Sequence, residues 1–189
     1  MAEPTTLEGL RRRACDELAR AAQDSKHPFH WPAFATVDSA GRPVLRTVVL
    51  RAFDETGPAA RFFTDARSPK LSHLAQHPAV SWLFYDAEQR LQVRLDGMGV
   101  VIVDEGGRRQ GFERARKGLF DYAGQLPPGT VIPDARASDH PDATESEAFP
   151  NFCIVETRVT QLEVLQLRRE GHLRALYAFH PPEAHWLAP

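Results

Sequence analysis

The sequence has little cysteine and no excess of charge of either sign. Its 189 residues include two cysteines, Cys15 and Cys153, which lie far apart and outside any CxxC pair. This usage predicts neither a disulfide framework nor a zinc site, and it fits a reducing compartment. The formal net charge of −2 gives no long-range attraction to nucleic acid or to an anionic membrane. We therefore expect neither of these among its partners.

Long hydrophobic runs are also missing. No apolar stretch approaches the roughly 18 residues that a membrane helix needs. The first residues lack the basic start and apolar run of a secretory signal. With 42% hydrophobic and 25% charged residues, the composition is that of a globular protein with a buried core. We expect a single domain over residues 1–189, located in the cytoplasm.

Several motifs that carry chemistry are absent. The chain has no GxGxxG segment that opens a helix after a first strand, and it has no P-loop, so a doubly wound nucleotide-binding fold is disfavoured. No GxSxG elbow is present either. His73 and His77 have the spacing of two zinc ligands on one helix, but no HExxH motif and no third ligand accompany them. We predict no metal site.

What the sequence does contain is a series of short strands joined by tight turns. Apolar residues recur at spacings of three and four after Thr5 and Thr6, which predicts an N-terminal helix within residues 1–27. Further helices are predicted from Ser68 to Pro78 and over 108–122. Strands are predicted over 34–37, 44–53, 61–64, 80–85, 91–103, 152–167, 173–179 and 186–187.

This order of elements predicts a mainly β fold, an antiparallel barrel with flanking helices, because alternating βαβ units are absent. Gly97 and Gly99 fall inside one predicted strand and indicate a bulge or a sharp bend there. Residues 124–150 contain five prolines and five acids, which predicts an irregular excursion or lid.

Arg46 is the first candidate for a functional residue. On a regular strand it shares a face with Val44, Val48 and Leu50. A charge on an otherwise apolar face costs several kcal/mol unless it finds an anion. Two partners satisfy this requirement: an internal carboxylate, or the phosphate of a ligand held by two parallel hydrogen bonds.

Ser68 and Lys70 form the second candidate. Serine is a good helix N-cap, and Pro69 fits the first helical position, where no amide donor is needed. The free amides and partial positive charge of a helix N-terminus suit a phosphate. Thr64, at the end of the preceding strand, adds a hydroxyl. The alternative is an ordinary serine cap with a lysine nearby.

Two more polar positions complete the set of candidates. Gln92 lies in the middle of a strand and both donates and accepts hydrogen bonds, as contact with a flat heterocycle requires. His172 and Arg174, on the last predicted hairpin, offer an imidazole and another cation. The alternatives are a cross-strand hydrogen bond for the glutamine and a solvated turn for the other two.

In this order, these pieces resemble the pyridoxamine 5′-phosphate oxidase family, the flavin mononucleotide (FMN)-binding split barrels. The resemblance covers most of the chain. It rests on residues 35–38, 41–43, 46–51, 63–64, 68–70, 91–93 and 186–189. It implies a split β-barrel that is antiparallel and Greek-key-like, with FMN as the cofactor. It also implies a homodimer that binds the flavin at the subunit interface and acts on a small-molecule substrate.

The resemblance also implies roles for individual residues. Arg46, Ser68 and Lys70 would hold the flavin phosphate, while Gln92 would face the ring and Arg174 would reach it from the last hairpin. The cofactor would be lined by Thr47, Val48, Val49, Leu50, Phe63 and Thr64. On the substrate side, Arg51 and His172 would make the contacts.

The sequence departs from the family pattern at several of these positions. Pro69 replaces an arginine of the phosphate element, with Arg67 as the candidate replacement, and Leu165 stands where the enzyme has a tryptophan. Residues 116–122 do not reproduce the tyrosine-arginine-serine set that binds the vitamin phosphate. Three interpretations remain open: an FMN-dependent oxidoreductase for an unidentified small molecule, a genuine pyridoxine/pyridoxamine 5′-phosphate oxidase that makes pyridoxal 5′-phosphate, and a non-catalytic binder of flavin, haem or deazaflavin.

Overall fold

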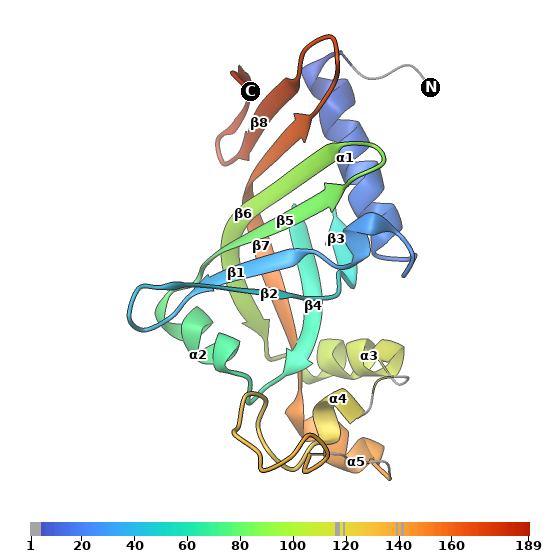
Figure 1. Ribbon diagram of the computed structural model, residues 1–189, viewed down its shortest axis with the longest axis vertical. Helices are drawn as coiled ribbons and strands as arrows, with labels where there is room; N and C mark the ends of the chain where they lie inside the picture. The colour runs from blue at the N-terminus through green and yellow to red at the C-terminus, as the bar shows by residue number, and fades with distance from the viewer. Residues whose placement is uncertain (1–4, 116–117, 119, 139, 141) are drawn as a thin grey trace.

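The computed structural model describes residues 5–115, 118, 120–138, 140 and 142–189 (Figure 1). Nine strands of this part of the chain form one antiparallel sheet in the order β2-β1-β5-β6-β7-β4-β3, with β8 paired to β7 and β9 to β8. The strands are β1 (Ala33–Val37), β2 (Pro43–Thr47), β3 (Ala52–Asp54), β4 (Ala59–Asp65), β5 (Ala79–Asp86), β6 (Leu91–Ile102), β7 (Phe152–Gln166), β8 (Leu173–Phe179) and β9 (Pro182–Leu187). The predicted fold class is confirmed.

Strand β7 is the spine of the sheet. Its first half pairs with β4, its second half pairs with β8, and β6 runs along nearly its whole length. The register between β6 and β7 shifts after Asp96, so that Thr160 of β7 is left over. A Cβ atom on Gly97 would lie 2.1 Å from the carbonyl oxygen of Arg158, so only glycine fits there. The predicted irregularity is thus a bulge, and its extra residue is on the partner strand.

The segment 44–53 was predicted as one strand, and this prediction was wrong. Strand β2 pairs with β1, the chain leaves the ladder at residues 48–51, and β3 then pairs with β4. The amides of Val48 and Leu50 bond to the carbonyls of Pro32 and His30 at 3.1 and 3.0 Å. Because β2 and β3 are the two ends of the strand order, this segment joins opposite edges of the sheet and closes the barrel.

The N-terminal helix α1 (Leu7–Ala21) covers the barrel core, as predicted. Thr6 is its N-cap, and its Oγ1 accepts a hydrogen bond from the amide of Gly9 at 3.1 Å. Beneath the helix, aromatic side chains fill the core, and each buried ring stabilises the fold by roughly 1.5–3 kcal/mol. The largest fully buried side chains of this core are Phe29, Phe34, Phe62, Trp82 and Phe84.

The other helices lie below the barrel in Figure 1. They are α2 (Pro69–Gln76), α3 (Glu105–Ala115), α4 (Phe120–Ala123) and α5 (Glu145–Ala148), with the short 3-10 turn η3 (Phe149–Asn151). Another 3-10 turn, η1 (Pro28–His30), packs instead against α1 and β5. The single helix predicted over 108–122 is therefore two helices, and positions 116, 117 and 119 lie outside the described residues. Phe112, Tyr122 and Phe152 form a second apolar cluster under α3 and α4.

The predicted excursion over 124–150 is mostly irregular, apart from α5. In the described part of the chain, no helix combines the length and apolar character that a membrane span requires. The same residues contain no group of three or more His, Cys, Asp or Glu side chains placed to hold a metal ion.

Candidate functional site

Two cations and three hydroxyls from four different elements meet at one end of the barrel. We call this set the cationic cluster, and it consists of Thr36 of β1, Arg46 of β2, Thr64 of β4, Ser68 and Lys70. Lys70, in the first turn of α2, donates hydrogen bonds from Nζ to Thr64 Oγ1 at 2.8 Å and to Ser68 Oγ at 2.7 Å. The sequence predicted that Arg46, Thr64, Ser68 and Lys70 meet, and the structure brings them together.

Arg46 points to the core side of the sheet. It pairs directly with Phe34, whose side chain is fully buried, and its guanidinium carbon lies 5.9 Å from the centre of that ring. Its Nη1 donates to Thr36 Oγ1 at 2.8 Å and to the Phe34 carbonyl at 3.3 Å. Burial lowers the pKa of Arg46. These neutral acceptors leave its positive charge without a counter-ion.

The second cation is also destabilised by its surroundings. Burial, together with the nearby charge of Arg46, lowers the pKa of Lys70. Within the described residues, no carboxylate oxygen lies within 4.0 Å of either cationic group. Two partly buried positive charges side by side therefore create a site that an anion would stabilise.

Ser68 occupies the N-cap position of α2, but its hydroxyl does not cap the helix. No side-chain cap hydrogen bond forms, and the hydroxyl instead accepts from Lys70. Pro69 stands at the first helical position, as predicted. The capping prediction was thus right about the position of Ser68 and wrong about the partner of its hydroxyl. That hydroxyl belongs to the cationic cluster and does not cap the helix.

Arg67, the candidate replacement for the missing arginine, is engaged elsewhere. Its Nε and Nη2 donate to the two carboxylate oxygens of Asp65 at 3.0 and 2.6 Å, and Nη2 also donates to the Gly124 carbonyl at 2.9 Å. The hydrogen bonds to Asp65 raise the pKa of Arg67. The charge of Arg67 is therefore neutralised within the chain, so Arg67 does not replace the family arginine that is absent at Pro69.

Arg51 lies beside the cluster's strand β4, where its guanidinium carbon is 5.5 Å from the ring centre of Phe63. Its side-chain Nε is buried and has no hydrogen-bond partner among the described residues. An orphaned donor of this kind costs about 1–3 kcal/mol. Phe63 itself packs edge-on against Phe152 at 5.0 Å. Thr47, Val48, Val49 and Leu50 form the segment between Arg46 and Arg51.

Gln92 and Arg174 lie on the opposite, outer face of the sheet. Gln92 alternates with the buried residues Leu91 and Val93, so it faces outward. Arg174 donates from Nε and Nη2 to Glu163 Oε1, both at 2.9 Å. Arg94 joins this group by ion pairs to Glu163 at 3.0 Å and to Asp96 at 2.9 Å. We call Arg94, Asp96, Glu163 and Arg174 the outer-face network.

The structure thus separates two sets of predicted residues within one chain. Gln92 and Arg174 do not meet the cationic cluster, because they lie on the other side of the sheet. His172 is exposed in the turn between β7 and β8, where its Nδ1 accepts a hydrogen bond from the Arg168 amide at 3.1 Å. It is also remote from the cluster along the sheet.

Sequence reasoning missed two members of this region, Thr36 and His73. Thr36 is 1% exposed and bridges Arg46 to His73, whose Nδ1 lies 3.0 Å from the threonine hydroxyl. The register of the first hairpin contained the signal for the threonine. Phe34 pairs with Arg46, and residues two apart on one strand share a face, so Thr36 must lie diagonally opposite the arginine.

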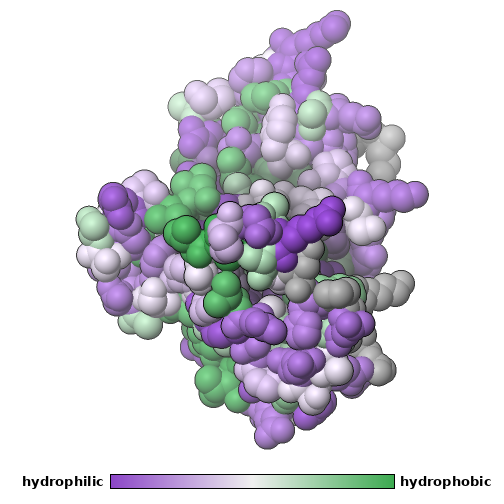
Figure 2. All heavy atoms as spheres, turned by 60° about the horizontal axis from the view of Figure 1, so that its bottom comes forward, coloured by the Kyte–Doolittle hydropathy of each residue, from purple (hydrophilic) through white to green (hydrophobic). Residues whose placement is uncertain are grey.

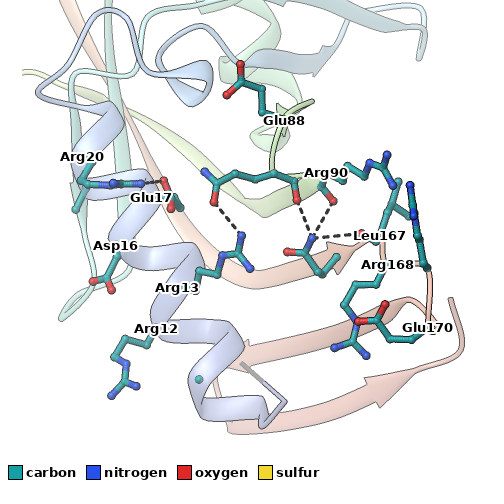
Figure 3. Close-up of a pocket in the computed structure, with 15 residues that line it drawn as sticks. Arg12, Arg13, Asp16, Glu17, Arg20, Glu88, Arg90, Leu167, Arg168 and Glu170 are labelled. Atoms are coloured by element: carbon teal, nitrogen blue, oxygen red, sulfur yellow. Dashed lines mark hydrogen bonds and ion pairs between the residues drawn. The ribbon is translucent and has the colours of Figure 1, made fainter. Parts of the chain in front are cut away.

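A large groove in the described part of the chain lies away from the cationic cluster. It has a volume of about 1010 Å³ and lies between α1, the β5–β6 turn and the β7–β8 turn (Figure 3). Its lining includes no residue of the cluster. We place the candidate site at the cluster because unneutralised charge, and not concavity alone, identifies a place for an anion.

Comparison with known proteins identifies the family of this chain. A family profile described as pyridoxamine 5′-phosphate oxidase, FMN-binding domain, matches residues 14–103. A pyridoxine/pyridoxamine 5′-phosphate oxidase of Burkholderia thailandensis is 46% identical over 153 residues, which cover 80% of this chain and 57% of that protein. The protein of the same name from Paraburkholderia xenovorans is 33% identical over 176 residues, covering 92% and 68%.

Several relatives are much longer than the region they share with this chain. The match spans 39%, 44%, 32% and 57% of the length of four pyridoxine/pyridoxamine 5′-phosphate oxidases. The chain therefore covers less than two thirds of each of them.

Solved structures agree with the fold. A pyridoxamine 5′-phosphate oxidase-related, FMN-binding protein of Nostoc punctiforme superposes with a TM-score of 0.70 at 28% identity, over 94% of this chain and 96% of that one. PhzG of Burkholderia lata, solved with tetrahydrophenazine-1-carboxylic acid, gives 0.72 at 21% identity, over 98% and 94%, which shows the fold alone. Taken with the relative that matches over two thirds of its length, these likenesses show that the chain belongs to the pyridoxamine 5′-phosphate oxidase family.

Proposed function

We propose that this protein is an FMN-dependent oxidoreductase and that its cationic cluster binds the 5′-phosphate of the flavin. One observation carries the proposal: Arg46 and Lys70 lie partly buried beside three hydroxyls, with no carboxylate within 4.0 Å among the described residues. A phosphate would neutralise both cations and accept hydrogen bonds from them. Hydrogen bonds to charged groups contribute about 1.5–3 kcal/mol each.

The residues around the cluster fit the rest of such a cofactor. Ser68 and Thr64 supply hydroxyls next to Lys70. We assign Phe63, next to Thr64 on β4, and the backbone of residues 47–50, directly after Arg46, to the rest of the cofactor. When bound, FMN supplies the redox chemistry by accepting a hydride equivalent from a substrate and passing electrons to an acceptor. We assign Arg51, whose buried Nε has no hydrogen-bond partner among the described residues, to an anionic or polar group of that substrate.

The proposed working unit is a homodimer with the flavin at the interface. Gln92 and Arg174 face away from the cluster of their own chain, so a second copy is needed to bring them to a flavin there. The outer face also exposes large apolar side chains at Leu45, Leu83, Tyr85 and Met98. Figure 2 shows hydrophobic atoms gathered on the side where the β1–β2 hairpin projects in Figure 1. Burying such side chains favours self-association.

The flavin spectrum tests the central claim. We expect the purified protein, as isolated or after loading with FMN, to show flavin absorbance that a reductant bleaches and air restores. A protein that cannot be loaded with FMN would contradict the proposal. A protein that binds FMN but shows no redox cycle would support the alternative of a non-catalytic binder.

Pyridoxine or pyridoxamine 5′-phosphate oxidation is the second candidate, because the curated relatives are named for it. We favour an unidentified small-molecule substrate instead, since the sequence does not reproduce the part of the family pattern that binds the vitamin phosphate. Formation of pyridoxal 5′-phosphate at ordinary enzyme rates would reverse this preference.

Both cysteines are buried and unpaired, which supports a location in the reducing cytoplasm.

A further inference from the structure

The large groove is built from three segments that are distant in the sequence. Its walls are α1 on one side and the β7–β8 turn on the other, and the β5–β6 turn closes it. Gln166, at the end of β7, is thirteen residues along that strand from Cys153, the partner of Thr64. At about 3.3 Å per residue, the groove is on the order of 40 Å along the strand from the cationic cluster of the same chain.

The lining of the groove is positively charged although the whole chain carries a net charge of −2. It contains six arginines and four carboxylates, a local excess of two positive charges. The arginines are Arg12, Arg13, Arg20, Arg90, Arg168 and Arg169. Arginine presents a planar fork of donors that matches the geometry of a phosphate.

The carboxylates do not neutralise this charge evenly. Glu17 is already bound to Arg20 and lies 2.8 Å from His27 Nε2. Figure 3 shows Asp16 on the other side of α1 from Arg13. Neither Arg90 nor Arg169 has a carboxylate within 4.0 Å among the described residues. Both cations come from the turns that close the groove.

A buried acceptor in the lining has no donor. Gln166 is 1% exposed, and its Nε2 donates to the Gln89 carbonyl at 2.8 Å. This bond fixes the orientation of the amide, so Oε1 is left buried without a hydrogen-bond partner in the described part of the chain. A buried acceptor in this state is destabilised until a donor reaches it.

Hydrogen bonds from β7 and α1 hold the β5–β6 turn, which carries Arg90, in place. Arg90 has φ of 50°, in the left-handed region that favours glycine, and its carbonyl accepts from the Leu167 amide at 3.0 Å. The neighbouring Gln89 accepts from Arg13 of α1 through its side chain at 2.8 Å. The three walls are therefore joined by hydrogen bonds, and the groove has a defined shape.

We propose that this groove binds a small organic phosphate that also carries an N–H or O–H donor. The phosphate lies against Arg90 and Arg169, and the donor reaches Oε1 of Gln166. We place phosphate and donor in one molecule because Gln166 and both arginines line the same cavity of about 1010 Å³. This site is independent of the proposed flavin function.

Calorimetric titration of the purified protein, with whatever flavin it carries, tests the inference. The probe is adenosine 5′-monophosphate, which combines one phosphate with amino and hydroxyl donors. We expect saturable binding with Kd below about 1 mM. Adenosine and inorganic phosphate, which each lack one half of the recognised chemistry, should bind at least about tenfold more weakly.

The variant Arg90→Gly/Arg169→Gln should weaken this binding by about tenfold or more. Glycine is compatible with the φ of 50° at position 90, so the turn keeps its shape. The matched control, Arg42→Gln/Arg158→Gln, removes two exposed arginines outside the groove and should bind like the parent. Three results would each overturn the proposal. They are the absence of saturable binding up to about 1 mM adenosine 5′-monophosphate, an equal loss of affinity in the control variant, and release of flavin by the nucleotide.

Discussion

The cationic cluster and the outer-face network are built from the same kinds of side chain and differ in one respect. In the outer-face network, Arg94 and Arg174 converge on Glu163, so each cation has a carboxylate at about 3 Å. In the cationic cluster, the hydrogen bonds of Arg46 and Lys70 within the described residues go to hydroxyls and a carbonyl. The first arrangement is complete within one chain, whereas the second lacks a carboxylate among the described residues and is completed by an anion under the proposed function.

This difference teaches how to separate structural from functional charge in this fold. A partly buried arginine costs free energy unless it is neutralised. Where the chain supplies the carboxylate, the arginine stabilises the sheet. Where the chain supplies hydroxyls instead, the fold bears this cost in the free protein, and the proposed phosphate would offset it.

The largest effect is expected from disrupting the proposed dimer, which would bring the outer-face network of one chain to the cationic cluster of the other. Leu83→Arg places a charge on the exposed apolar side chains of the outer face and should cost the dimer about 2–4 kcal/mol. Sedimentation should show a monomer, and FMN affinity should fall with it. The control Val131→Arg alters a highly exposed valine outside the strands. A Leu83→Arg dimer of normal affinity would place the interface elsewhere.

Removing Arg46, which has no carboxylate partner among the described residues, should have the next largest effect. Arg46→Ala should weaken FMN binding by about 1.5–3 kcal/mol, roughly 10- to 150-fold, because it deletes a charge-assisted hydrogen bond. Flavin fluorescence quenching measures the change. Arg61→Ala, which removes an exposed arginine paired with Glu156, serves as the control. If Arg46→Ala binds FMN normally, the phosphate lies elsewhere.

Removing the shared carboxylate of the outer-face network should affect stability more than cofactor binding. Glu163→Gln keeps the shape of the side chain but removes the charge partner of Arg174 and leaves Arg94 with Asp96 alone. We expect the free energy of unfolding to fall by about 1–2 kcal/mol, less than for a fully buried pair, because both arginines are about one third exposed. Denaturant unfolding measures this. A loss of FMN affinity as large as that of Arg46→Ala would erase the distinction between the two regions.

The smallest effect is expected in the FMN-free protein. Burial lowers the pKa of Lys70, so at neutral pH the charged side chain destabilises the folded state. Lys70→Met should therefore raise the free energy of unfolding by about 0.5–1 kcal/mol at pH 7 while weakening FMN binding. Leu71→Met, a volume-conserving change at the next position of α2, is the control.

The pH dependence follows from the direction of that shift. Below the lowered pKa, Lys70 is charged in both the folded and the unfolded chain, and the destabilisation is complete. As the pH rises from that value towards about 10.4, the unfolded chain binds more protons than the folded one, so stability increases. The difference between parent and Lys70→Met should shrink over this window. A difference that stays constant with pH would contradict the burial of this charge.

Much of the fold was predictable because its signals are local. The alternation of apolar residues gave the strand over 173–179 with the bounds observed for β8, and the apolar stripe after Thr6 gave α1. The glycine at position 97 marked the bulge. The approach of Arg46, Thr64, Ser68 and Lys70 also followed from the sequence, through the family resemblance that their order carries.

The amino-acid sequence by itself determined the strands, the first helix and the kinds of side chain available to a phosphate, because alternation, capping and residue chemistry depend on neighbours in the chain. Only the tertiary structure decided that the segment 48–51 crosses between sheet edges and that Arg67 is paired with Asp65. It also decided that Gln92 and Arg174 face away from the cluster. Those outcomes depend on which distant groups come within hydrogen-bonding distance, and closure of the barrel sets those distances.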